Sequence, residues 1–458
     1  MALQQDPAIS FFNYTIEEFV IESHDGKSST DVTQCVASIK YYEDLFSPSI
    51  FISVVLVNTQ GILSNLISSD KFKTGIRGGE RVRLKVKQPA FPKDSIILDE
   101  TKNTYYIYKT SLSTTEYTRE VLMVDLCPAE VFTNETSRVV KKYKGNIGGS
   151  VRSILKDVLK IDSNKIPEGN IESTVNDYMF YGNTKRPFTV ITWLCPKSIP
   201  GNRSKPSSSS AEKGTAGFLF YQNKNGYHFK SMDSLLSGLK LDTTNKRNIQ
   251  TYYYGTPPNS ASGIQNRLIT DTPTFEKNVN VMENLRIGMY ASKNYFFDVN
   301  AKKFNEYNYN LKESYKLMSH ASRLNVPPQV PMGLDKNPSR VMVRILDNFN
   351  ADPANIKDTT PAINNEDKTY LYQAASLARY NLAFSQSLNI TIPLNLSLTV
   401  GDVIDLQFPK ITTSSERGTK DDVKSGHYLI KEVAHLFENN QGYTGLKLIR
   451  DSYGPPAE

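Results

Sequence analysis

The sequence predicts a β-rich α+β protein in which two antiparallel β units flank an α/β middle unit. Tyr (26) and Phe (21) are abundant beside a single Trp, which is typical of proteins whose planar side chains fill pleated sheet faces. Runs of strand length fill the first third of the chain, and the clearest helical spacing follows Ser150. At 458 residues the chain is too long for one compact core, and we expect three units.

The first unit is predicted to be a meander of strands with polar connections. The expected strands are 20–21, 34–42, 50–57, 81–87, 105–110 and 120–125. Within 81–87, Val82, Leu84 and Val86 alternate with basic residues, so one face is buried and the other is charged. A meander of this kind is more stable when it closes into a barrel or stacks as a sandwich than when its edges stay open. We therefore assign residues 1–135 to the first β unit.

The charged face of this strand, which we call the basic row, consists of Arg81, Arg83, Lys85 and Lys87. A solvated strand face, a contact with an acidic protein neighbour and a contact with nucleic acid would each use such a row. We name the basic row as a possible subunit contact. The net charge of +7 is modest for this length, and because the charge is spread along the chain we expect no stable nucleic-acid binding.

The middle unit is predicted from two helices and a hairpin. Val151, Ile154, Leu155, Val158 and Leu159 form an apolar stripe of helical period, with Ser150 as the expected N-cap. A second helix is expected after Arg186, with Pro187 in its first turn and Pro196 at its end. Strands 217–222 and 227–230 flank a turn that contains Asn223 and Gly226. Residues 202–215, which are rich in Ser, are expected to be a mobile surface loop.

The last part of the chain is predicted to contain a long helix and a second β unit. The expected elements are strands at 284–290 and 295–299, a helix at 370–386, and strands at 388–392, 394–398, 404–408, 427–437 and 443–450. The prolines between 327 and 338 and the polar segment 352–367 indicate a connection between units. We assign 136–261 and 312–365 to the middle unit, and 262–311 and 366–458 to the second β unit.

No arrangement of residues indicates catalysis, a cofactor or a metal. The chain has no phosphate-binding glycine motif, no HExxH pair and no nucleophile elbow. Cys35, Cys127 and Cys195 are too far apart for a zinc motif and are expected to be reduced structural thiols. His427 and His435 are expected to be solvated strand residues. We therefore expect a protein that is not an enzyme.

The sequence also shows no targeting or membrane-spanning segment. Met1 to Asp6 lack the charged stretch followed by an apolar stretch that marks a secretory signal. No run approaches the 18 or so apolar residues that a membrane span requires. We expect a protein that is made in a cytoplasm and has no membrane span.

Several segments resemble phage baseplate hub proteins. GFLFYQNKNGYHFKSMDSLL, which follows the helix RPFTVITWLC, is similar to the middle domain of that family. The C-terminal order is similar to the second tube-like barrel of the family. It consists of the helix TYLYQAASLARYNLAFSQ, then LNITIPLNLSLTVGDVIDLQF, then the hairpin HYLIKEVAHLFENNQGYTGLKLIRDSY. Related domains occur in VgrG, the spike protein of type VI secretion, which fuses hub and spike.

This resemblance implies two tail-tube-like antiparallel β-barrel domains flanking an α/β middle domain. It implies a homotrimer in the virion, at the tail baseplate, that adapts the hexameric tail tube to the trimeric central spike. Its expected partners are the central spike protein, tail tube or tube-initiator proteins, and baseplate wedge proteins. The alternative from a different class is a tail-associated wall-degrading or glycan-binding protein, and an enzyme of this kind would need two carboxylates set apart in a cleft.

Overall fold

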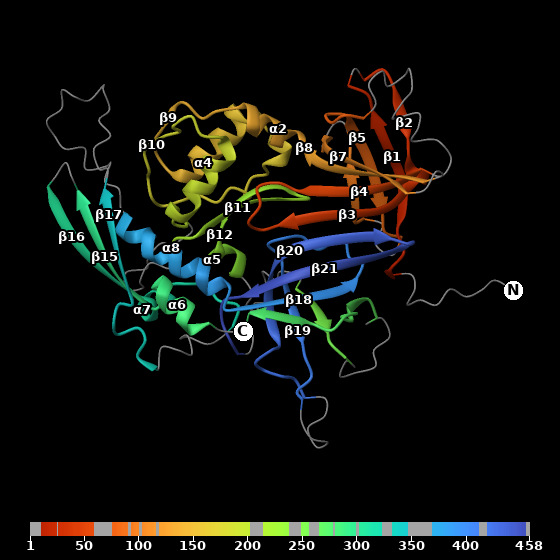
Figure 1. The fold of residues 1–458 in the computed structure, drawn as a ribbon. Helices are drawn as coiled ribbons and strands as arrows, with labels where there is room; N and C mark the ends of the chain where they lie inside the picture. Colours follow the sequence, from red (N-terminus) through yellow and green to blue (C-terminus); the bar gives the residue numbers. More distant parts are fainter. Residues whose placement is uncertain are drawn as a thin grey trace.

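The computed structural model describes most of the chain (Figure 1). The described residues are 11–24, 26–58, 76–89, 93–99, 103–115, 119–201, 214–237, 249–255, 265–277, 280–298, 302–322, 332–346, 369–411 and 419–454. A sheet of 14 strands runs through the molecule, with an α/β unit against one part of it and a small separate sheet at one end. The expected Ser-rich loop, except for its end at Gly214 and Thr215, and the segment 352–367 lie outside the described residues.

The N-terminal β unit is a curved sheet around its own apolar core. Its strands are β1 (Thr15–Glu22), β2 (Ser29–Asp31), β3 (Val36–Asp44), β4 (Phe51–Asn58), β5 (Arg81–Lys87), β6 (Ser95–Leu98), β7 (Tyr105–Thr115) and β8 (Arg119–Pro128). They lie in the order β3-β4-β8-β7-β5-β1-β2, with β6 beside β5. Phe19, Ile39, Val54, Leu84 and Val124 are completely or almost completely buried in the core. The strict alternation in β4 and β5 explains their pattern of buried and half-exposed residues.

The C-terminal β unit is built mainly from the end of the chain. Its strands are β13 (Gln250–Tyr253), β14 (Thr274–Lys277), β18 (Gln386–Pro393), β19 (Val403–Gln407), β20 (Gly426–Glu438) and β21 (Gln441–Arg450). β14, β18, β21 and β20 lie side by side, and β19 and β13 extend the sheet from β20. A large apolar cluster fills this unit, including Leu388, Ile404, Tyr428 and Leu448.

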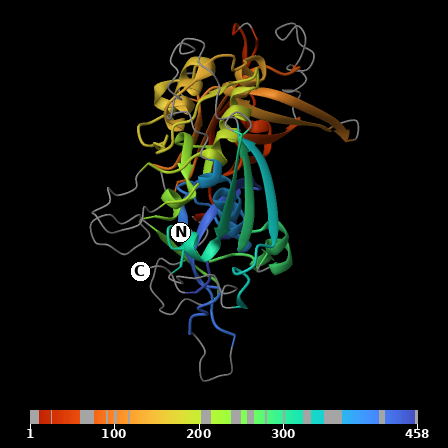
Figure 2. The ribbon, with the colours of Figure 1, turned by 90° about the vertical axis from the view of Figure 1, so that its left-hand side faces the viewer.

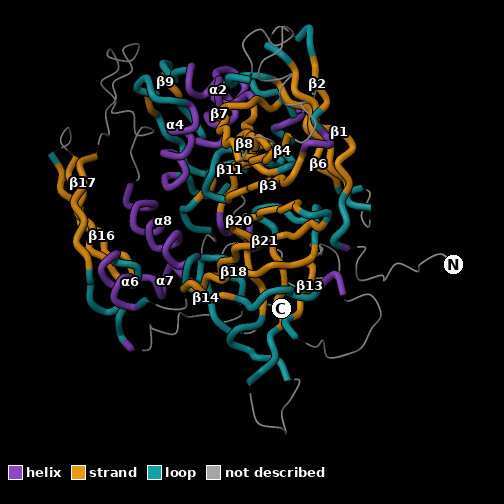
Figure 3. The backbone as a smooth tube through the Cα atoms, turned by 45° about the vertical axis from the view of Figure 1, so that its right-hand side comes forward, coloured by secondary structure: helices purple, strands orange, loops and turns teal. Residues whose placement is uncertain are grey.

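The two β units are joined edge to edge by β3 and β20. Their antiparallel pairing runs from Asp44 opposite Glu432 to Ser38 opposite Glu438. Figure 3 shows the strands of the two units as one series from β18 through β20 and β3 to β4. One chain therefore contributes two β units to a single sheet. No pairing among the described strands closes either unit on itself, so closure into barrels stays a prediction.

The middle unit packs its helices around a separate core. It contains α2 (Ala129–Thr136), α3 (Ile147–Ser153), α4 (Pro187–Leu194), α5 (Met232–Leu236), and the short pairs β9 (Lys142–Tyr143) with β10 (Phe180–Tyr181) and β11 (Phe218–Asn223) with β12 (Gly226–Ser231). Val151, Ile154, Leu155 and Leu159 are buried together, as the helical period predicts. Asn146 caps α3 by accepting from the Gly149 amide, so the prediction of Ser150 as N-cap is wrong.

A small sheet and three helices form the remaining part of the molecule. The sheet contains β15 (Ala291–Asp298), β16 (Lys303–Asn310) and β17 (Arg340–Leu346), with β15 in the centre. It lies with α6 (Val281–Ile287), α7 (Leu311–Tyr315) and α8 (Thr369–Ala383) beyond one end of the large sheet (Figure 1). Ala374, Ala378 and Leu382 of α8 pack in one cluster with Tyr290 and Tyr309. Figure 2 views the molecule from the side on which this sheet lies.

Three sequence predictions differ from the structure in this part of the chain. Residues 284–290 are not a strand, because Asn280 caps α6 and Gly288, in a left-handed conformation, ends it. Residues 394–398 are a turn segment and not a strand. β15 and β16, placed by us with the second β unit, form their own sheet, whereas β13, placed with the middle unit, pairs with β19. The exact domain boundaries stay a prediction.

Candidate functional site

The large sheet has one face on the two apolar cores and one face that stays partly open. In β20, Val433, His435 and Phe437 are buried, whereas the alternating positions are exposed or half-exposed. The same alternation holds in β3, β4 and β21. The open face carries polar or small residues at its centre, namely Lys40, Tyr42, Ser53, Asp125, Glu432, Ala434, Gly445 and Lys447, and also apolar side chains, of which Met123 is 42% and Leu436 is 36% exposed. We call this surface the open sheet face.

Charges on the open sheet face are largely compensated within the chain. Lys447 Nζ lies 2.8 Å from the Glu276 carboxylate, which joins β21 to β14. Lys109 Nζ lies 3.7 Å from Asp125. Side-chain pairs across neighbouring strands stabilise a sheet and do not form a cleft. Charged side chains of the open sheet face are thus held in pairs between strands of the same sheet.

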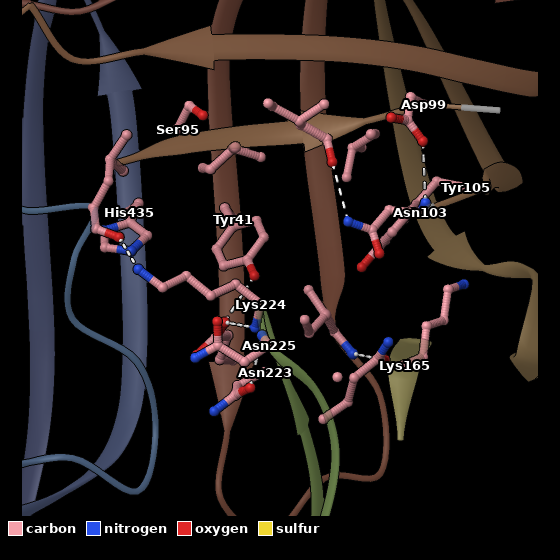
Figure 4. Close-up of a pocket in the computed structure, with 18 of the residues that line it drawn as sticks. Tyr41, Ser95, Asp99, Asn103, Tyr105, Lys165, Asn223, Lys224, Asn225 and His435 are labelled. Atoms are coloured by element: carbon pink, nitrogen blue, oxygen red, sulfur yellow. Dashed lines mark hydrogen bonds between the residues drawn. The ribbon is translucent and has the colours of Figure 1, made fainter. Parts of the chain in front are cut away.

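The second feature is the place where all three units meet, which we call the junction (Figure 4). Its centre is the carboxylate of Glu43 at the end of β3, which is 1% exposed. The carboxylate accepts hydrogen bonds from Tyr41 Oη at 2.7 Å, the Lys224 amide at 2.9 Å and the Val400 amide at 3.0 Å. Lys224 belongs to the hairpin turn of the middle unit and Val400 to the C-terminal unit. One buried acceptor thus connects the three units.

The Lys224 side chain makes a further connection across the junction. Its Nζ donates to the carbonyl oxygens of Leu396 at 2.6 Å and Ser397 at 2.9 Å. It also lies 4.0 Å from the Asp94 carboxylate of the first unit. Gln222 accepts from the Ile50 amide at 3.2 Å, so the hairpin contacts both β units. The middle unit therefore contacts both β units and fixes their position relative to each other.

Burial perturbs the titratable groups of the junction in the direction that disfavours charge. Burial raises the pKa of Glu43, although hydrogen bonds from Val400 and Tyr41 act the other way. Burial lowers the pKa of Lys224. Burial also lowers the pKa of His228 to about 3 and that of His435 to about 3. These groups serve packing, because each is held by neighbours of its own chain.

A cavity of about 380 Å³ opens beside the junction. Its lining includes Tyr41, Glu43, Tyr105, Lys165, Lys224 and His435. Lys165 forms a close ion pair with Glu130, and Glu43 and Lys224 are engaged as described above. A perturbed pKa in a cavity is a common mark of a catalytic site, but hydrogen bonds within the chain occupy the main polar groups here. The arrangement holds three units together through Glu43 and Lys224.

The basic row lies where the sequence placed it, on one half-exposed face of β5. The neighbouring strand β1 supplies a carboxylate for each cation. Arg81 and Arg83 contact Glu22 at 2.6 and 3.0 Å, and Lys85 and Lys87 contact Glu17 at 2.8 and 2.6 Å. Glu18 adds a contact to Arg83 at 3.2 Å. The basic row is thus a ladder of ion pairs between two strands, and its role as a subunit contact stays a prediction.

The remaining candidate residues have structural surroundings. Cys35, Cys127 and Cys195 are buried free thiols, as predicted. His427 and His435 are 9% and 2% exposed, so the prediction that they are solvated is wrong. A register shift between Ile430 and Glu432 changes the alternation in β20, and this shift cannot be recognised from the eight-residue spacing. Within the described ranges, no group of three His, Cys, Asp or Glu residues is placed to hold a metal ion. None of the described helices is long and apolar enough to cross a membrane.

Sequence reasoning missed Glu43 and Lys224 as the residues of the junction. One signal was present, because Ile39, Tyr41 and Glu43 share an alternation, which places an acidic residue on the buried side of β3. An acidic residue in that position needs a partner. The partner amide lies 181 positions along the chain, and no local pattern identifies it.

Several solved structures are similar to this chain over most of its length. A tail protein from Neisseria meningitidis MC58 is 9% identical with a TM-score of 0.48, and the match covers 97% of this chain and 100% of that chain. The 43 kDa tail protein of prophage MuSo2 from Shewanella oneidensis is 9% identical with a TM-score of 0.47, over 95% and 98% of the two chains.

A third similar structure is the Escherichia coli c3393 protein, described as a component of the type VI secretion system that is structurally similar to the T4 tail proteins gp27 and gp5. It is 9% identical with a TM-score of 0.40, over 97% of this chain and 79% of that chain. The three structures are thus described as tail proteins or as a component of the type VI secretion system. No family model matches the sequence, and no curated protein matches it.

Proposed function

We propose that this chain is a structural baseplate hub of a contractile phage tail. Three copies form a ring that adapts the hexameric tail tube to the trimeric central spike. The ring belongs to the virion, at the tail baseplate, and assembles in the host cytoplasm. Its function is geometric, because it supplies matching surfaces to two neighbours of different symmetry and catalyses no reaction.

The observation that carries this proposal is the pairing of β3 with β20. It places two β units side by side in one sheet within one chain. Three chains that continue this sheet from edge to edge supply six units around a channel, with threefold symmetry of the chains and near-sixfold symmetry of the units. A closed ring also removes open sheet edges.

The junction supports the same role. A hub must keep its two β units in fixed register while its neighbours move. Glu43 and Lys224 fix that register through contacts from all three units. In the ring, the open sheet face lines the channel, and charged side chains on it, such as Lys447 and Asp125, are paired with neighbours of the same chain. The two axial neighbours are the central spike protein and the tail tube or tube-initiator proteins, and baseplate wedge proteins surround the ring.

The basic row is proposed as a secondary subunit contact within this ring. Reversal of Arg81, Arg83 and Lys85 to Glu would test it poorly, because the new carboxylates would face Glu17, Glu18 and Glu22 and weaken the β1–β5 pairing. Lys85→Gln together with Lys87→Gln removes the charge without repulsion. If the row is a subunit contact, this variant forms fewer rings at low salt while its free energy of unfolding falls only slightly, because exposed ion pairs contribute little. Unchanged ring formation would remove the contact.

A tail-associated wall-degrading or glycan-binding protein is the competing proposal. An enzyme of this kind predicts turnover of peptidoglycan by the purified chain, whereas a hub predicts none. The hub proposal itself is tested by light scattering of the purified chain over a range of concentrations. A mass of three chains supports it. A protein that stays monomeric both alone and with its spike contradicts it.

A further inference from the structure

The small sheet has two edges of very different character. Its outer strand β16 exposes Lys303, Asn305, Glu306 and Asn308, and such polar and charged side chains discourage pairing with another strand. The other edge strand, β17, has the sequence RVMVRIL. It contains no Lys and no Pro. Its charged residues are Arg340 and Arg344 and its other five residues are apolar, so β17 is less protected against pairing than β16.

Three branched apolar side chains of β17 point away from the molecule. Val341, Val343 and Ile345 are 60%, 72% and 66% exposed. Phe297 on β15, opposite Ile345, is 41% exposed, and Phe304 on β16, opposite Phe297, is 61% exposed. These residues form one apolar strip across the sheet. Apolar residues gathered in this way on a surface usually mark an interaction site.

The inner side of β17 is already occupied, so only its outer edge is available. β17 pairs in parallel with β15 over its full length, from Arg340 opposite Ser292 to Leu346 opposite Asp298. Its alternate residues face the protein, where Met342 packs with the cluster around α8. Among the described strands, none pairs with the outer edge of β17. A strand added there would extend the sheet from three strands to four.

The sequence of β17 is complementary to itself in one antiparallel register. When two copies pair about Val343, Val343 lies opposite Val343, and Val341 lies opposite Ile345. On the other face, Met342 lies opposite Arg344, and Arg340 lies opposite Leu346. All seven residues of the strand are paired, and no arginine faces another arginine.

Other registers are less favourable. A shift that centres the pairing on Met342 places Arg340 opposite Arg344, and a shift that centres it on Arg344 places two arginines opposite each other. A shift by one position brings apolar and charged residues onto the same face. The full-length register about Val343 is therefore the one in which each branched apolar residue meets another.

We propose that the outer edge of β17 pairs with β17 of a second copy of this chain, around a two-fold axis at Val343. The contact joins the two small sheets into a sheet of six strands, β16-β15-β17 followed by the same three in reverse. It is isologous, because each copy gives the same surface. It is independent of the proposed ring, which joins three chains through the edges of the large sheet.

The register makes a specific prediction for cysteine crosslinking. At the two-fold axis, the Cα atoms of the two copies of residue 343 lie about 4.5 to 5.5 Å apart, which permits a disulfide. The two copies of residue 341 lie on the order of 13 Å apart along the strands, which does not. The natural cysteines are buried and do not compete. Val343→Cys is therefore expected to give a linked dimer under mild oxidation, and Val341→Cys to give none.

A second measurement uses the mass of the unmodified protein. Light scattering of the full chain at increasing concentration is expected to show a mass that doubles, and Val343→Lys is expected to abolish the doubling while the circular dichroism spectrum stays the same. Val423→Lys, at a position that is 58% exposed elsewhere, is the matched control and should behave as the unmodified protein.

The two experiments have clear contrary outcomes. Equal crosslinking of Val343→Cys and Val341→Cys indicates random collision and overturns the register. Absence of crosslinking in both, together with a mass that Val343→Lys leaves unchanged, overturns the contact. Slow hydrogen exchange of those β17 amides that point away from β15, in a protein that stays monomeric, shows that the outer edge is covered by its own chain and overturns the proposal as well.

Discussion

In most proteins charged residues are exposed and apolar residues are buried. The junction and the β17 edge depart from this distribution in opposite ways. At the junction, the charged groups Glu43 and Lys224 are placed inside, and their hydrogen bonds lead to all three units. At β17, the apolar residues Val341, Val343 and Ile345 are placed outside. The buried polar groups thus fix contacts within this chain, whereas the exposed apolar groups of β17 are where we propose a contact with a second copy. Predictions on both regions test this division.

The largest effect is expected from loss of the Glu43 carboxylate. Glu43→Ala leaves Tyr41 Oη and the amides of Lys224 and Val400 without their acceptor in a buried place. Each buried unpaired donor costs about 1 to 3 kcal/mol, so the free energy of unfolding should fall by about 3 to 5 kcal/mol. Urea unfolding measures the loss. Glu43→Gln, which keeps an acceptor, should lose clearly less, and equal losses would show that the acceptor does not matter.

A smaller effect is expected from Gly226, at the start of β12 in the junction hairpin. Its φ of +108° is strained for other residues, and an added Cβ would lie 2.3 Å from the Lys165 carbonyl oxygen. Gly226→Ala should therefore lower the free energy of unfolding by about 2 to 4 kcal/mol, which combines the backbone strain with overpacking.

The matched control for this substitution is Gly169. It has a φ of +93°, and a Cβ added there would meet no atom within 4 Å. Gly169→Ala should carry only the backbone strain of roughly 1 to 2 kcal/mol. The difference between the two variants isolates the close approach of the hairpin to its neighbour, and two equal losses would contradict that approach.

The next effect is a dependence of stability on pH. Burial lowers the pKa of His435 to about 3, so the folded protein binds fewer protons than the unfolded chain between pH 3 and about 6.5. Stability is therefore lost as the pH falls through this window, by at most about 1.4 kcal/mol per pH unit for this residue. Glu43, whose pKa is raised by burial, acts in the opposite direction.

Substitution separates these two opposing contributions. His435→Asn should reduce the loss of stability between pH 6 and 4.5, as measured by urea unfolding at several pH values. An unchanged slope would show that another group causes the dependence.

The smallest effect is expected at the β17 edge. Val343 is 72% exposed, so Val343→Thr removes few contacts of the single chain, and its free energy of unfolding should change by less than about 0.5 kcal/mol. The same substitution should weaken self-association. A large loss of stability in dilute protein would mean that the strip is covered within the chain, and the comparison between the two regions would fail.

Much of the fold was predictable from local patterns. The strand 81–87 was predicted to the residue, because basic and apolar residues alternate throughout. The helix after Arg186 was predicted because Pro187 suits a first turn. The helix at 281–287 was missed, although its caps, Asn280 and Gly288, were signals that could have been used. Apolar residues in 284–290 were interpreted as a strand because a short run fits both periods.

Local sequence patterns could not predict the junction or the sheet to which each strand belongs. Glu43 contacts an amide 181 positions away, and β3 pairs with β20 across most of the chain. Such pairings depend on how complete units pack against each other, and they cannot be inferred from a single sequence. The assignment of β13 and β15 to different sheets has the same origin, since both are short aromatic strands in a similar local setting.

We propose that one chain supplies two of six units in a closed ring. Electron microscopy of the purified Val343→Lys protein, in which the β17 contact is removed, tests it most directly. The account predicts rings of three chains with six similar sectors and with β3 beside β20 inside each chain. Rings of six chains, or particles in which the two β units of one chain are separated, would contradict it.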